Sequence, residues 1–172
     1  ESVLIRLERF TSLPLPQGDI AIERPVTSAV CNAARTGSLV VIGEPGAGKS
    51  GVIHSVAVEL SKEAEVVVLT VEAGAISLHV LQQDIGLSHP LEDVMRSLPG
   101  ERPAYLILDA LDAARGGLAE ATYRKLVEKV SAIPGWHVLA SVRTFDLRLG
   151  REWKRLFLGE PPAPNYADSQ FS

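Results

Sequence analysis

The stretch that decides the fold is Gly-Glu-Pro-Gly-Ala-Gly-Lys-Ser, residues 43–50. It matches the phosphate-binding pattern GxxxxGK followed by Ser or Thr at every fixed position. Glycines let successive backbone N–H groups point at phosphates, a lysine ammonium reaches the β and γ oxygens, and a serine hydroxyl joins the Mg²⁺ shell. We therefore expect nucleotide binding by a continuous segment that consists of Gly43, Glu44, Pro45, Gly46, Ala47, Gly48, Lys49, Ser50 and Gly51.

The residues on both sides of this loop support that interpretation. Leu39-Val40-Val41-Ile42 is wholly apolar, as expected for a strand that is buried on both faces of a parallel sheet. Residues 51–63 then place Val52, Ile53, Val56, Ala57 and Leu60 on one face of a helix whose N-terminus would hold the phosphates. This strand-loop-helix order favours a P-loop over a glycine-rich turn in another αβ unit.

The rest of the chain predicts more strands and helices in alternation. Further strands are expected at 65–71, 104–108 and 137–142, and helices at 25–35, 76–85, 90–98 and 118–133. In the last helix the expected inward residues are Leu118, Ala121, Leu126, Val130 and Ile133. The pattern predicts an α/β fold, a three-layer αβα sandwich with a mainly parallel sheet, of the P-loop NTPase type. A fifth strand is missing, so we expect the fold to be incomplete at its C-terminal end.

Length and composition give the broad class. The 172 residues fit one domain, and we assign 22–172 to the core and 1–21 to a linker or partial flanking segment. A formal charge of −4 argues against a general nucleic-acid binder. Cys31 is the only cysteine and is expected to be a small buried hydrophobe in a protein of a reducing, cytoplasmic compartment. No apolar run approaches the ~18 residues of a membrane span. Because the chain opens on Glu1, we expect it to be a piece of a longer protein.

Three charged residues near strand ends complete a candidate catalytic set. Asp109 ends the apolar run Tyr105–Leu108, as in the second motif of P-loop enzymes, whose aspartate orients Mg²⁺. Asp112 could orient the attacking water, and Arg143 could contact the γ-phosphate. With Lys49 they form our candidate catalytic group, and Ser50 and Asp109 are the candidate metal ligands. The alternatives are that Asp109 caps a turn, that Asp112 is an exposed turn residue, and that Arg143 only neutralises the carboxylates.

Taken together, these motifs resemble a known family. Residues 43–50, Leu-Ile-Leu-Asp-Ala-Leu-Asp at 106–112 and Val-Leu-Ala-Ser-Val-Arg at 138–143 are similar to the nucleotide-binding core of STAND ATPases, the signalling NTPases that include the NACHT group. The resemblance covers about residues 22–145, is nearest to bacterial members, and implies Mg²⁺ ligation by Asp109, a hydrolytic role for Asp112 and a sensor role for Arg143. Ala110 and Ala113 stand where the family has glycine and an acid, so slow hydrolysis is expected.

These observations favour an ATP-binding domain, with ATP, dATP or ADP and Mg²⁺ as ligands, in a larger signalling switch. Protein partners or self-assembly would then act through regions outside this sequence. An AAA+ ATPase would need glutamate at position 110, and a GTPase would need an Asn-Lys-x-Asp sequence, which is absent. Three alternatives remain: a regulatory module that does not hydrolyse, a small-molecule kinase with Arg148, Arg151 and Arg155 in its lid, and a nucleic-acid motor, against which the acidic charge and few aromatic residues count.

Overall fold

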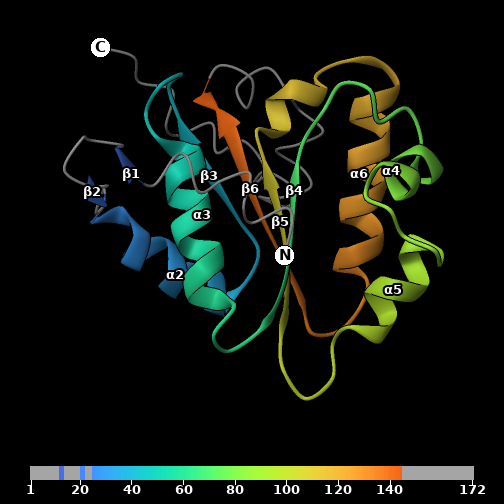
Figure 1. Ribbon diagram of the computed structural model, residues 1–172, viewed down its shortest axis with the longest axis horizontal. Coiled ribbons are helices and arrows are strands. Elements are labelled where there is room, and N and C mark those ends of the chain that lie inside the picture. Colours follow the sequence, from blue (N-terminus) through green and yellow to red (C-terminus); the bar gives the residue numbers. More distant parts are fainter. Residues whose placement is uncertain (1–11, 14–19, 22–24, 145–172) are drawn as a thin grey trace, which may run out of the picture.

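The structure, a computed structural model, describes residues 12–13, 20–21 and 25–144 (Figure 1). Two short strands, β1 (Ser12–Leu13) and β2 (Ile20–Ala21), pair antiparallel. The main sheet has four strands, β3 (Leu39–Gly43), β4 (Glu65–Thr70), β5 (Ala104–Asp109) and β6 (Trp136–Arg143). The helices are α2 (Val26–Thr36), α3 (Lys49–Leu60), α4 (Leu78–Asp84), α5 (Leu91–Ser97), the 3₁₀ helix η1 (Leu111–Ala114) and α6 (Gly117–Ser131).

The four main strands are parallel and lie in the order β3-β6-β5-β4. Gly43 is in register with Arg143 across β3 and β6, and Thr70 with Asp109 across β4 and β5. The carboxyl ends of all four strands therefore meet at one edge of the sheet, where ligands bind in folds of this kind. Strand β6, the last in the sequence, lies between β3, which leads into the P-loop, and β5, which carries Asp109.

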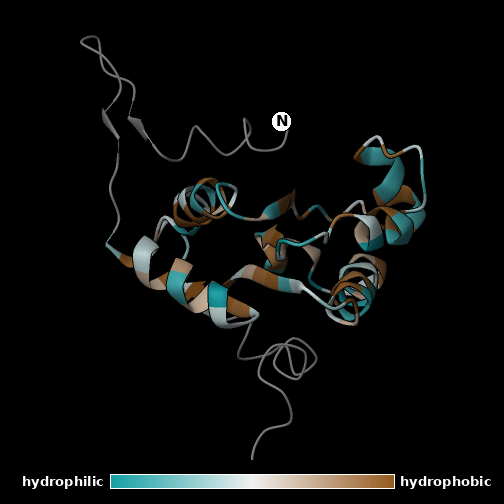
Figure 2. Cartoon of the chain, turned by 90° about the horizontal axis from the view of Figure 1, so that it is seen from below, coloured by the Kyte–Doolittle hydropathy of each residue, from teal (hydrophilic) through white to brown (hydrophobic). Residues whose placement is uncertain are grey.

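Helices cover both faces of the sheet. Figure 1 shows α2 and α3 on one side and α4, α5 and α6 on the other, and Figure 2 shows hydrophobic strands between these two layers. Each face has its own core, one around Ile53, Val56 and Ile107 and the other around Leu106, Leu108 and Leu126. This arrangement confirms the predicted three-layer αβα sandwich.

The helix after the P-loop has the predicted buried face. Val52, Ile53, Val56, Ala57 and Leu60 are all at most 4% exposed. Its partner α2 buries Cys31 at 3% exposure, as predicted for a small hydrophobe, and burial raises the pKa of the Cys31 thiol. The thiol is therefore kept in its neutral form inside the α2–α3 layer.

The buried face of α6 differs from the predicted one. Leu118 is 65% exposed and Ala121 is also exposed, so these two expected core positions are wrong, whereas Leu126, Val130 and Ile133 are buried. The actual buried stripe of the helix is Ala119, Thr122, Tyr123, Leu126, Val127 and Val130. Tyr123 fixes this rotation because its hydroxyl accepts a hydrogen bond from the Glu72 N–H (3.3 Å) while its ring fills the core.

Several predictions concern residues that the structure does not describe. The arginine lid at Arg148, Arg151 and Arg155 falls in residues 145–172, and the predicted incompleteness of the fold at its C-terminal end also concerns this range. The domain boundary at residue 22 also lies outside the described ranges. Within the described part of the sheet, β3 is an outer strand, and its residue Ile42 is 47% exposed. None of the described helices is both long and apolar enough to cross a membrane.

Candidate functional site

The loop between β3 and α3 has the backbone of a phosphate cradle. Gly46 and Gly48 adopt left-handed conformations, with φ of 78° and 79°, which side chains disfavour. The first helical hydrogen bond runs from the Val52 N–H to the Gly48 carbonyl (3.1 Å). Among the residues described, no side chain caps the helix, and its first turn contains no acidic residue. The N–H groups of the first turn thus form a positive helix end suited to an anion.

Lys49 bends back over this loop. Its Nζ donates to the carbonyl oxygens of Gly43 (2.9 Å) and Glu44 (3.0 Å). The bent side chain packs against Gly43, where an added Cβ would lie in ordinary van der Waals contact, 3.6 Å from Lys49 Cγ and Cδ. The ammonium is therefore held at the mouth of the loop by two neutral acceptors, which a phosphate oxygen can replace.

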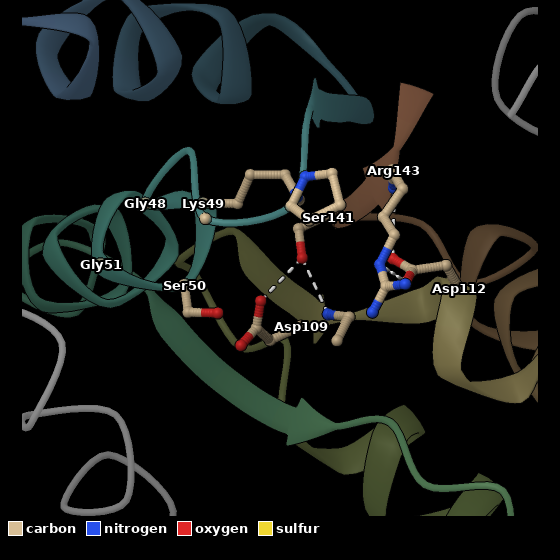
Figure 3. A pocket seen from close by; sticks show the side chains of 11 residues that line it. Gly48, Lys49, Ser50, Gly51, Asp109, Asp112, Ser141 and Arg143 are labelled. Carbon is tan, nitrogen blue, oxygen red and sulfur yellow. Dashed lines mark hydrogen bonds and ion pairs between the residues drawn. The ribbon is translucent and has the colours of Figure 1, made fainter. Parts of the chain in front are cut away.

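The predicted site residues converge on one open cavity of about 360 Å³ (Figure 3). Its lining comes from the P-loop, the end of β5 with the turn that follows, and the end of β6. The lining residues are Pro45, Gly46, Gly48, Lys49, Ser50, Gly51, Asp109, Ala110, Asp112, Ser141 and Arg143. Gly43, Glu44 and Ala47 belong to the loop but are not part of this lining, so the structure brings together all but three of the predicted residues.

Asp109 is held in place by a residue that the sequence analysis did not identify. The Asp109 side chain is 3% exposed, and its Oδ1 accepts a hydrogen bond from Ser141 Oγ at 2.7 Å. The same oxygen of Ser141 accepts the Ala110 N–H at 2.8 Å. Ser141 is fully buried. The signal in the sequence was a hydroxyl residue in an apolar run, because such a group needs a hydrogen-bond partner when it is buried.

Asp112 and Arg143 form an ion pair beside Asp109 (Figure 3). Arg143 Nε lies 2.8 Å from Asp112 Oδ2, and the Arg143 backbone N–H donates to Asp112 Oδ1 at 3.2 Å. The Asp112 side chain is 5% exposed and that of Arg143 is 55% exposed. Asp112 is therefore not the exposed turn residue of the alternative interpretation. The neutralising pairing that we weighed for Arg143 is present, and a sensor or catalytic role for either residue stays a prediction.

The turn between Asp109 and Asp112 contains backbone strain. Ala110 has φ 58° and ψ 48°, and it is the only non-glycine residue with positive φ among the residues described. A left-handed alanine costs roughly 1–2 kcal/mol. The glycine that the STAND resemblance leads one to expect at position 110 would adopt this conformation without that cost. Ala110 therefore adopts a backbone conformation that glycine would adopt more easily.

Two oxygen donors in the cavity fit a magnesium ion. Figure 3 shows the Ser50 hydroxyl and the Asp109 carboxylate facing the same space. Hydroxyl and carboxylate oxygens are ligands that Mg²⁺ accepts. Among the described residues no group of three or more His, Cys, Asp or Glu side chains could hold a metal. Mg²⁺ is often held by one or two side chains together with phosphates and water, and Ser50 and Asp109 would supply such a pair.

Solved structures with the same architecture support the fold assignment. PCH-2 from C. elegans matches with a TM-score of 0.53 and 13% identity over 77% of this chain and 40% of that chain. AMPPCP-bound DnaA from Aquifex aeolicus matches with a TM-score of 0.55 and 13% identity, over 81% of this chain and 46% of that chain. Drosophila ORC bound to DNA matches with a TM-score of 0.51 and 15% identity, over 84% of this chain and 44% of that chain. The sequence matches no protein-family model and no curated protein.

These neighbours are AAA+ P-loop ATPases. With the parallel sheet and the glycine loop, they define the class: the chain has a P-loop NTPase fold. The chain spans less than half the length of each of these three neighbours.

Proposed function

We propose that this chain is the ATP- and Mg²⁺-binding domain of a larger cytoplasmic switch protein, with a role in signalling or defence. The observation that carries the proposal is the single cavity in which the P-loop helix end meets Asp109, Asp112 and Arg143. This cavity combines a helix N-terminus and two cationic side chains with a buried carboxylate. Such a combination suits a triphosphate together with its metal ion.

Each residue has a defined task in this proposal. Backbone N–H groups from Gly46 to Gly51 bind the phosphate oxygens, and Lys49 exchanges its two carbonyl partners for the β and γ oxygens. Ser50 and Asp109 are the protein ligands of Mg²⁺, which would neutralise the charge of the phosphates and orient them. Asp112 binds Arg143 through Nε, and the other guanidinium nitrogens of Arg143 are directed toward the γ-phosphate in this proposal.

We further propose that ATP hydrolysis, where it occurs, is slow. Asp112 is the candidate base, yet both of its carboxylate oxygens are engaged by Arg143. Each oxygen keeps a second lone pair, but a proton taken up from water would neutralise the carboxylate and weaken its ion pair with Arg143. With alanine at position 113, the site has one carboxylate fewer than the STAND resemblance leads one to expect. Slow turnover would suit a domain that resets a nucleotide-controlled assembly.

The same ion pair favours a second candidate, a regulatory module that binds nucleotide without hydrolysing it. In that case Asp112 only positions Arg143. The two candidates differ in one measurement, the steady-state ATP turnover of the intact protein compared with that of Asp112→Ala. A small-molecule kinase stays a third alternative, and the arginines that would form its lid lie outside the described residues.

The finer assignment to STAND proteins rests on the motif resemblance. The solved neighbours are AAA+ proteins, and two of them are reported with AMPPCP or with DNA. We keep ATP as the ligand because a base-recognition sequence for GTP is absent. The expected lack of nucleic-acid binding stays a prediction, since the Drosophila neighbour is bound to DNA.

A direct binding experiment tests the central proposal. We expect a fluorescent ATP analogue to bind the intact protein in the presence of Mg²⁺ and to be displaced by ATP, dATP or ADP but weakly by GTP. Titration with labelled duplex and single-stranded DNA in the same buffer tests the nucleic-acid prediction. Absence of analogue binding at millimolar Mg²⁺ would refute the proposed function.

A further inference from the structure

The Ser141 hydroxyl connects two parts of the candidate metal site. It donates its single proton to Asp109 Oδ1 (2.7 Å) and accepts the Ala110 N–H (2.8 Å). Neither direction can be reversed, because the backbone N–H is only a donor and an ionised carboxylate is only an acceptor. The proton of Ser141 therefore has one position, on the side of Asp109.

This bond fixes how the Asp109 carboxylate is turned. Among the described residues, Ser141 is the hydrogen-bond donor to this carboxylate, and it binds Oδ1. The second oxygen, Oδ2, is then left for a ligand in the cavity that Ser50 also lines. With Ser141 fully buried on β6, the donor belongs to a rigid strand and not to a loop.

The second bond of Ser141 holds the start of the next turn. Ala110 is the strained left-handed residue, and its N–H has Ser141 Oγ as acceptor. Asp112, two residues further on, is tied to the end of the same strand through Arg143. The turn from Asp109 to Asp112 is thus fastened to β6 at both ends, by Ser141 at one and by Arg143 at the other.

We propose that Ser141 is a positioning residue for Mg²⁺-dependent nucleotide binding, acting by presenting Asp109 Oδ2 to the metal. The inference rests on the proposed function and adds a residue to it. Ser141 itself touches neither the metal nor the phosphates in this proposal. Residues that orient a metal ligand typically change metal affinity by 10- to 100-fold when they are removed.

The experiment compares Ser141→Ala with Ser38→Ala in the intact protein. Ser38 is a matched control because its hydroxyl accepts the Val138 N–H (2.8 Å) at the other end of the same strand. Binding of a fluorescent ATP analogue is measured as Mg²⁺ is titrated, and again in EDTA. For Ser141→Ala we expect the Mg²⁺ concentration at half-maximal binding to rise about tenfold, with unchanged affinity in EDTA. Ser38→Ala should match the wild type in both.

Two results would overturn the inference. One is an unchanged Mg²⁺ midpoint in Ser141→Ala, and the other is an equal loss of affinity with and without metal, which indicates a general structural role. Should Ser141→Ala fail to fold, Ser141→Cys, which keeps the volume but hydrogen-bonds weakly, is judged by the same criterion. If the wild type binds no analogue at all, the proposed function fails and this inference with it, whereas normal wild-type binding isolates the role of Ser141.

Discussion

Arg143 holds both carboxylate oxygens of Asp112, one through its Nε (2.8 Å) and the other through its own backbone N–H (3.2 Å). The backbone bond does not depend on the arginine side chain, so it persists when the guanidinium moves. Asp112 can therefore release Nε to a phosphate without losing its own position. This relationship decides what each variant of the pair should do.

Asp112→Ala tests the catalytic prediction. If Asp112 orients the attacking water, the variant should lower the steady-state ATP turnover of the intact protein by about a hundredfold. Asp93→Ala is the control, because Asp93 is an exposed carboxylate on α5. Equal turnover in Asp112→Ala and the wild type would exclude Asp112 as the base and favour the regulatory module.

Arg143→Ala, alone and combined with Asp112→Ala, separates catalysis from positioning. If Asp112 acts only by holding Arg143, both single variants and the double variant should lose the same amount of nucleotide affinity. If the two residues act independently, the losses should add. The measurement is analogue affinity at saturating Mg²⁺, with melting temperatures recorded to confirm that each variant is folded.

Lys49→Ala tests the glycine loop itself. A hydrogen bond to a charged group is worth about 1.5–3 kcal/mol, so ATP affinity should fall roughly ten- to hundredfold. The loss is reduced by the two carbonyl bonds that Lys49 makes before binding. Lys125→Ala is the control, since Lys125 is exposed on α6. Unchanged ATP affinity in Lys49→Ala would remove the basis of the nucleotide assignment.

Ala110→Gly should stabilise the protein. Relief of the left-handed strain gains about 1–2 kcal/mol, and the added backbone freedom of glycine costs about 0.5–1 kcal/mol, so the free energy of unfolding should rise by up to about 1.5 kcal/mol. Ala113→Gly, in a right-handed conformation three residues later, should instead lower it. Urea denaturation measures both, and a loss of stability in Ala110→Gly would contradict the strain argument.

The buried Cys31 thiol should make stability depend on alkaline pH. Burial raises its pKa above the ordinary value of 9.0, so the folded state keeps the proton that the unfolded state loses. The contribution is fully present below the unfolded pKa of 9.0 and is lost as pH rises through the folded pKa. Urea midpoints from pH 7 to 10 should therefore fall more in the wild type than in Cys31→Ala. Parallel curves for the two proteins would show that Cys31 makes no such contribution.

Local patterns predicted most of the fold. The strand-loop-helix around residues 43–50 and the four strands follow from short apolar runs and from glycine chemistry, both of which act between near neighbours in sequence. Asp109 could be named as a candidate site residue from the sequence, because a carboxylate that directly follows a buried strand needs a partner. The convergence of Asp112 and Arg143 followed from the common edge at which parallel strands end.

Other features depend on long-range contacts that the sequence does not display. The rotation of α6 is set by Tyr123 and its bond to Glu72, and spacing alone gave a face that included the exposed Leu118. The partners of Ser141 are Asp109 at the end of β5 and Ala110 directly after it, 32 and 31 residues away. Its role was not predicted because no local pattern states which strand lies beside β6.

The strand order has a consequence for how the site is maintained. β6 is bonded to β3 on one side and β5 on the other, so two independent ladders fix its register. A slip of one residue would turn Ser141 to the opposite face of the sheet and would break both ladders. The position of Ser141 in the cavity is thus fixed by the pairing of β6 with its two neighbouring strands. It should stay preorganised when the cavity holds no nucleotide, so that ligand binding need reorient only the ends of the Lys49 and Arg143 side chains.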